Sequence, residues 1–159
     1  MSNSKNNIVK LLNAIEPNYL MIVKKLGDDD YPILYELMEG KDIGLACKVI
    51  CCLGLLKTKK SWNGVAKAAQ SENREIRMTA AFALRYLTNF PKTVSIIGHL
   101  LNDSSLEVRK YALKSIEFAK ITSLKKEVKE LGQKEKSDRM KNLSLKILDV
   151  LNKIDPNVN

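Results

Sequence analysis

Residues 75–84 read EIRMTAAFAL and residues 107–116 read EVRKYALKSI, so the two stretches align position by position without a gap. A further step of the same length leads to RMKNLSLKIL at 139–148, which is a weaker copy. Another amphipathic segment precedes each copy, at 62–69, 94–101 and 124–131. Two helices in about 32 residues, repeated along a chain, are the signature of an α-solenoid.

The apolar side chains of each copy fall on one face of a helix. At about 100° per residue, Ile76, Ala80 and Leu84 lie on the same side, and the stripe recurs in the other two copies. No segment alternates apolar and polar residues with period two, as a half-buried strand does. The sequence therefore predicts an all-α fold, with the second helix of each pair close to 43–57, 73–88, 105–119 and 137–153.

The predicted helix at 43–56 is apolar on every side except Lys48, so most of its surface must be covered. Residues 8–15 and 19–23 are the nearest amphipathic cover, and a partner protein is the alternative. The register of this first repeat stays open. We expect a single solenoid domain divided into an N-terminal helical cap, four repeats and a tail, at 1–27, 28–58, 59–90, 91–121, 122–154 and 155–159.

The clearest copy resembles the second helix of a HEAT repeat, which carries an Asp before a Val-Arg pair, then an Ala and a Leu. The matching residues are Asp103, Val108, Arg109, Ala112 and Ile116. Ser71 replaces the Asp in the copy before it, and the last copy is degenerate. The resemblance implies a curved right-handed superhelix whose second helices line a concave face.

The resemblance also gives a role to the arginine that the two best copies share. It implies that Arg77, Asp103 and Arg109 form a hydrogen-bonded ladder between neighbouring repeats. Phosphate binding by the two arginines is the competing interpretation. Short polar side chains before the second helices are candidate N-caps: Ser71 or Asn73, Asp103 or Ser104, and Ser137 or Asp138.

Residues opposite the buried stripe should form the concave face. We expect the partner-binding residues there to be Met78, Phe82, Arg85, Lys110, Lys114, Asn142 and Lys146. An exposed aromatic beside several cations is typical of a binding groove. The alternative is that the 43–56 helix covers Phe82.

Positive charge is concentrated in two blocks. Residues 57–92 carry 8 basic and 2 acidic side chains, and residues 120–146 carry 9 basic and 4 acidic ones, within a chain of net charge +9. Such blocks favour an acidic protein segment or a nucleic acid as partner, although solvated helix faces are also rich in lysine.

Residue types that carry catalysis or bind metals are sparse. His99 is the single histidine, and Cys47 and Cys51 lack a second metal-binding pair nearby. We therefore expect no metal, no cofactor and no enzyme activity. The enzymatic alternative is a HEAT-like DNA glycosylase, whose catalytic aspartate cannot be placed on this chain.

The sequence thus predicts a non-catalytic scaffold or adaptor that binds another protein, one with an acidic segment, through a basic and partly apolar concave face. Nucleic-acid binding is the alternative. The absence of a long apolar run or signal peptide, and the odd number of cysteines, indicate an intracellular, cytoplasmic protein with no membrane contact. The sequence does not define the oligomeric state.

Overall fold

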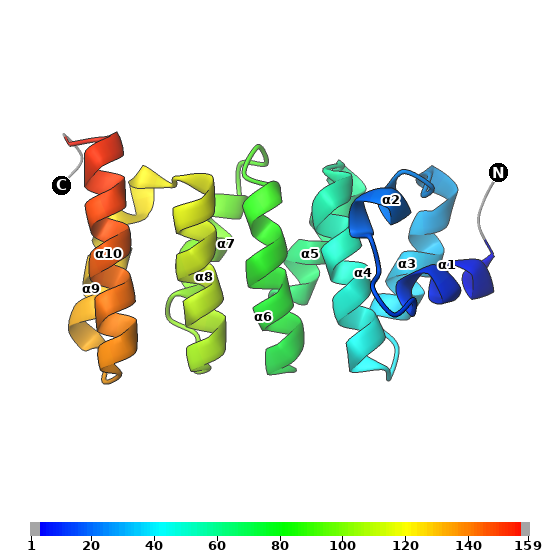
Figure 1. Ribbon diagram of the computed structural model, residues 1–159, viewed down its shortest axis with the longest axis horizontal. Helices are drawn as coiled ribbons and strands as arrows, with labels where there is room; N and C mark the ends of the chain where they lie inside the picture. The colour runs from blue at the N-terminus through cyan, green and yellow to red at the C-terminus, as the bar shows by residue number, and fades with distance from the viewer. Residues whose placement is uncertain (1–3, 157–159) are drawn as a thin grey trace.

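The computed structural model describes residues 4–156 as a row of helices without a strand. Four antiparallel helix pairs stack side by side, and two further short helices lie at the N-terminal end (Figure 1). The prediction of an all-α solenoid is confirmed. The α-helices are α1 (Lys5–Leu12), α2 (Tyr19–Val23), α3 (Tyr31–Met38), α4 (Ile43–Leu56), α5 (Lys59–Ala68), α6 (Arg74–Ala83), α7 (Thr93–Leu100), α8 (Leu106–Ala119), α9 (Lys125–Lys134) and α10 (Asp138–Ile154).

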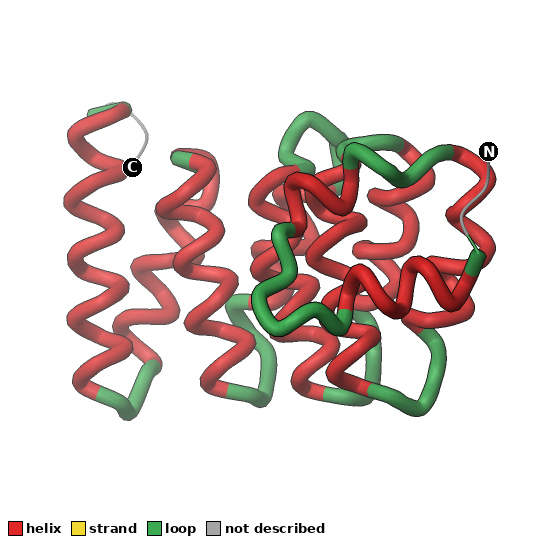
Figure 2. Tube along the Cα trace, turned by 45° about the vertical axis from the view of Figure 1, so that its right-hand side comes forward, coloured by secondary structure: helices red, strands yellow, loops and turns green. Residues whose placement is uncertain are grey.

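Short 3-10 turns extend or introduce three of these helices: Asp28–Asp30 before α3, Leu84–Tyr86 after α6 and Thr122–Leu124 before α9. The second helices α4, α6, α8 and α10 lie in one layer and run in the same direction, while α5, α7 and α9 lie behind them (Figure 1). The connecting loops gather at the two edges of the stack (Figure 2). We call the outward surface of the second helices the second-helix face.

The predicted stripes are the core. Ile76, Ala80 and Leu84 are at most 6% exposed, and the matching residues of α8 are fully buried. In α10, Met140 and Ser144 are buried and Leu148 is partly buried. Trp62 is also a core residue, because its indole packs against Phe90 and its Nε1 donates to the Thr93 hydroxyl at 2.9 Å. Burial of these stripes between neighbouring pairs holds the stack together.

The N-terminal helices cover α4, the helix that is apolar nearly all round. Ile8 and Leu12 of α1 and Ile22 of α2 are buried in the common core. Lys48, the one charged residue of α4, donates to the Asn13 side chain at 2.9 Å. The helix α2 lies in front of part of α4, at the N-terminal end of the second-helix face (Figure 1).

The helix starts follow the expected chemistry at α6 but not at α8 or α10, and Ser137, the N-cap of α10, makes no side-chain capping bond. Asn73 caps α6 through its side-chain oxygen, as the sequence suggests. At α8 the N-cap is Ser105, not Asp103 or Ser104, and its side chain makes no capping bond. The Asp103 carboxylate is engaged elsewhere, with Arg77 and with the Ser105 backbone N–H.

Two helices end in the left-handed conformation on a lysine. Lys57 after α4 and Lys120 after α8 have φ of 53° and 54°. Within residues 4–156, no helix combines the length and the apolar character that a membrane crossing requires.

Candidate partner-binding face

A groove between α8 and α10, which we call the lysine groove, gathers four of the seven residues predicted to bind a partner. Lys110 and Lys114 come from α8, and Asn142 and Lys146 come from α10. The groove has a volume of about 470 Å³ and an apolar floor that includes Leu106, Met140 and Leu143. The repeat explains the grouping, since Lys114 and Lys146 occupy the same position in successive second helices.

The cations of this groove make no ion pair within residues 4–156. Lys110, Lys114, Lys146 and the neighbouring Arg139 are absent from every salt bridge between described side chains. Glu107, one turn before Lys110, is the carboxylate that lines the same groove. An open groove with four cations and one carboxylate attracts acidic groups.

The neighbouring part of the face, over α6 and α8, is an aromatic platform. Phe82 lies edge-on to Tyr86 and to Tyr111, with ring centroids 6.0 Å and 6.2 Å apart. Tyr86 in turn packs edge-on against Phe118, at 5.4 Å. Phe118 is 56% exposed, so the cluster reaches solvent. Aromatic pairs in this geometry stabilise one another beyond their buried area, so the platform is rigid.

Arg85 contacts two rings of the aromatic platform. Its guanidinium lies 4.2 Å from the centroid of Phe82 and 5.1 Å from that of Phe118, and its Nε donates to the Ser115 hydroxyl at 3.3 Å. Its Nη2 is buried without a hydrogen-bond partner in the described structure. Burial lowers the pKa of Arg85 from its ordinary value. The stacking fixes both rings relative to each other.

A cleft of about 570 Å³ borders the platform where α2 crosses in front of α4. Phe82 and Tyr86 form one side of this aromatic cleft, and Cys51 and Leu55 of α4 contribute to its lining. The segment from Pro17 to Leu20 closes the remaining side. Phe82 is thus neither free nor covered by α4 alone, because the cap helix and its own aromatic neighbours share its surface.

Met78 lies differently from the other predicted residues. Its side chain is half-buried and packs against the hydrophobic core. Met78 therefore offers only part of its side chain to a partner.

The arginines of the two best copies bind carboxylates between repeats. Arg77 donates to both oxygens of Asp103, at 2.7 Å and 3.0 Å, and Arg109 donates to both oxygens of Glu135, at 3.0 Å and 2.8 Å. The Nη1 of each arginine also donates to two backbone carbonyls of the preceding loop. Both pairs are nearly buried, which leaves no free guanidinium for a phosphate.

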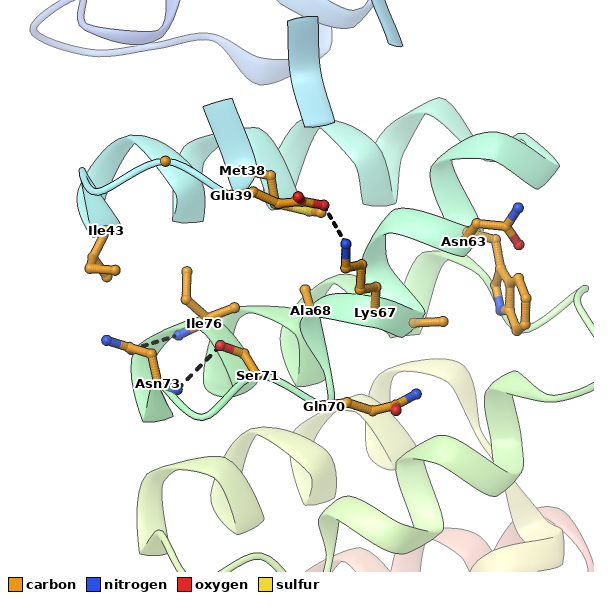
Figure 3. A pocket seen from close by; sticks show the side chains of 13 residues that line it. Met38, Glu39, Ile43, Asn63, Lys67, Ala68, Gln70, Ser71, Asn73 and Ile76 are labelled. Atoms are coloured by element: carbon orange, nitrogen blue, oxygen red, sulfur yellow. Dashed lines mark hydrogen bonds and ion pairs between the residues drawn. The ribbon is translucent and has the colours of Figure 1, made fainter. Parts of the chain in front are cut away.

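A further pocket, at the edge of the stack, lies outside this face. It measures about 670 Å³ and lies where α3 and α5 end and α4 and α6 begin. Some of its polar groups pair with one another (Figure 3): Glu39 pairs with Lys67 at 2.5 Å, and the Asn73 side chain accepts the Ile76 N–H. These groups serve the fold, and none of the predicted site residues lines the pocket.

Two cysteine thiols of α4, those of Cys51 in the lining of the aromatic cleft and of its neighbour Cys52, are protonated near neutral pH. Burial, assisted by the neighbouring thiols, raises the pKa of Cys51 to about 11 and that of Cys52 to about 12. A thiol that stays protonated is a poor nucleophile and a poor metal ligand. These cysteines therefore act as small apolar side chains in α4.

Sequence reasoning missed two residues that the repeat register could have found. Phe118 occupies the position of Tyr86 one repeat later, and Glu135 occupies that of Asp103. The HEAT pattern has an Asp at the position of Glu135, so a search for that pattern passes over the glutamate.

No protein-family model matches the chain, and no curated protein matches it. Solved structures of similar fold exist. One is a chain from the complex of CpcE and CpcF of phycocyanin lyase from Nostoc sp. PCC7120, with a TM-score of 0.63 and 12% sequence identity over 96% of this chain and 66% of that chain. Another is an engineered protein, with a TM-score of 0.55 and 16% identity over 94% of this chain and 79% of that chain. The TM-scores show a shared fold, a HEAT-like helical solenoid, and at these identities the likeness extends to the fold alone.

The comparison corrects one prediction. We expected a chain without enzyme activity, but a solenoid of this fold is part of phycocyanin lyase. The expectation rested on the scarcity of catalytic residue types in the sequence, and it is overturned because a HEAT-like solenoid can also serve an enzyme, as one fold carries many functions.

Proposed function

We propose that the chain binds another protein through the second-helix face, and that the partner contributes an acidic segment with one or two apolar anchors. The observation that carries this proposal is the juxtaposition of the aromatic platform with the lysine groove. Phe82 and Lys114 occupy the same register in adjacent helices, and packed helices lie roughly 10 Å apart. One short peptide segment can therefore touch both surfaces.

Each half of the face has a distinct task. The platform and the adjoining cleft offer Phe118, Phe82 and Tyr86 to an apolar side chain, in the way that interface hot spots use aromatic residues and arginine. The groove offers Lys110, Lys114 and Lys146 to carboxylates. Charge complementarity there should govern mainly the association rate and the choice of partner.

A protein partner fits this face better than a nucleic acid does. Glu107 lines the groove and reduces its positive charge, which disfavours a continuous phosphate backbone more than a segment that carries a few carboxylates. Part of the basic excess is engaged elsewhere, since Lys60 pairs with Asp28 and Lys67 pairs with Glu39. The CpcE–CpcF complex, in which a chain of this fold is found together with a second protein, is further support. An intracellular, cytoplasmic location accords with three free thiols.

Partner capture from the native host at moderate salt, with and without nuclease, tests the proposal. Phe118→Ala should weaken capture at least tenfold if Phe118 is a hot spot, while Ile15→Ala, at a fully exposed apolar side chain that lines neither the aromatic cleft nor the lysine groove, should leave it unchanged. The double variant Lys114→Glu/Lys146→Glu should also reduce capture, with Lys92→Glu as its control.

Loss of the captured material on nuclease treatment, together with an unchanged result for Phe118→Ala, would contradict the proposal and favour nucleic-acid binding. Binding to duplex DNA would then weaken with salt with a log–log slope of about −0.9 for each phosphate contact.

A further inference from the structure

The outer surface of α10 repeats the pattern that earlier second helices bury against the next repeat. Ala81, Leu113 and Leu145 share one register position in three successive repeats. At Ala81 the backbone carbonyl accepts a hydrogen bond from the Ser115 hydroxyl of the following repeat, at 2.6 Å, so this position faces the next pair. Ala81 and Leu113 are fully buried, whereas Leu145 is 63% exposed.

The register position three residues further along each second helix shows the same loss of burial in the last repeat. Leu84 and Ile116 are fully buried in the stack, and their equivalent Leu148 is only partly buried. Among residues 4–156 nothing covers the outer side of α9 and α10, which form the end of the row in Figure 1. An apolar row that is buried in two repeats and open in a third marks a contact surface.

The charged position of the interface is also repeated. Arg77 and Arg109 each reach a carboxylate 26 residues further along the chain, in the next repeat. Lys141 occupies the same register in α10. Its ion pair is with Asp138 on its own helix, at 3.2 Å, and the Asp138 side chain is 90% exposed. A pair this exposed is worth little and exchanges readily for a better partner.

A groove of about 730 Å³ between α9 and α10 joins these features. Leu145 and Leu148 form its apolar part, and Lys126, Lys129 and Lys141 surround them. Ser144 lines the groove with a buried hydroxyl that has no hydrogen-bond partner within the described residues. Asp149, the carboxylate of the groove, already pairs with Lys153. The surface is therefore apolar and basic.

We infer that this end surface of α9 and α10 docks a helical-repeat unit of another protein, stacked as the internal repeats are, with a carboxylate opposite Lys141. The partner unit presents an apolar helix face to Leu145 and Leu148 and acidic side chains to the lysines. This docking surface is separate from the second-helix face and does not depend on the function proposed for it.

The chain itself supplies a suitable probe, a synthetic peptide of residues 122–155. This unit packs on α8 in the structure and carries Glu135, the carboxylate that Arg109 binds. Titrated against the full chain, the labelled peptide should bind and gain helicity. Leu145→Asp in the full chain should weaken binding at least tenfold, because a leucine side chain is no longer buried. Ile15→Asp, at a fully exposed apolar side chain outside this surface, should have no effect.

A charge exchange identifies the ladder contact. Lys141→Glu should weaken binding of the wild-type peptide about threefold to tenfold, and the peptide variant Glu135→Lys should restore it. Binding that ignores Leu145→Asp, or a charge exchange that restores nothing, would overturn the inference.

A fused unit guards against a peptide that fails to fold. When a second copy of residues 122–155 is placed after Asp155, its high effective concentration should give one cooperative thermal transition at a higher temperature than that of the parent chain. Leu145→Asp should remove this gain. Independent melting of the added unit would overturn the inference. Self-association of the full chain that Leu145→Asp abolishes would replace the partner protein with a second copy, and would also overturn it.

Discussion

The junction between α4 and α6 and the junction between α8 and α10 hold neighbouring repeats together by different means. At the first, a Cβ added to Gly54 would stand 2.9 Å from the Cβ of Ala83, so the helices meet backbone to backbone. At the second, Arg109 and Glu135 form a nearly buried ion pair. The register positions of that pair, counted from the N-cap of each helix, fall on Ala46 and Ser71 at the first junction, where no ladder can form. Neighbouring repeats of the same fold are thus held together either by close apolar packing or by a buried ion pair.

The strongest test of this contrast is Arg109→Ala. The change leaves Glu135, whose side chain is 8% exposed, as a buried carboxylate without its partner. We expect a loss of about 2–3 kcal/mol in the free energy of unfolding, measured by urea denaturation. Lys141→Ala, at the equivalent position of α10 with only an exposed pair, should change it by less than about 0.5 kcal/mol. Equal losses in the two variants would show that the ion pair contributes nothing special.

Gly54→Ala tests the apolar junction and should have a smaller effect. The added methyl meets Ala83 backbone atoms at 3.1 Å and 3.2 Å, which forces α4 and α6 apart. We expect a loss of about 1–2 kcal/mol, the cost of overpacking less the gain in helix propensity. Gly44→Ala, where the methyl meets only the Asp42 side chain at 3.4 Å, should instead stabilise the chain by up to about 1 kcal/mol in the same urea experiment.

The smallest expected effect is the acid sensitivity of the middle junction, between α6 and α8. Hydrogen bonds from Arg77 hold the pKa of the Asp103 carboxyl below its ordinary value, and the Ser105 backbone N–H assists. Because the folded-state pKa is depressed, this contribution is present above the unfolded pKa of about 3.9 and is lost as the pH falls below it. Between pH 5 and pH 3, the melting temperature of the wild type should fall more than that of Arg77→Met/Asp103→Asn. Parallel pH curves would contradict this.

The repeat register predicted the helices and the buried stripes because spacing alone determines which residues face the neighbouring repeat. The same spacing was enough to group Lys110, Lys114, Asn142 and Lys146 on one surface. It did not predict that Met78 packs against the core, because the sequence of a single repeat does not specify how closely neighbouring helices approach. Nor did it predict the position of α2, since a short amphipathic helix can cover α4 from several directions. The position of α2 decides where the aromatic cleft lies.

The common direction of the second helices gives the binding face an electrical polarity. The partial positive charge of each helix dipole lies at the start of the helix, and the starts of α8 and α10 are at the same edge of the stack. Glu107, Lys110 and Arg139 belong to that edge, while Tyr86 and Phe118 lie near the opposite one, where the helices end. The positive potential of the helix dipoles and the charge of the basic side chains therefore add at one edge of the face, and the aromatic contacts lie at the other edge. A bound segment is thereby given a direction, with its carboxylates toward the helix starts and its apolar anchor toward the helix ends.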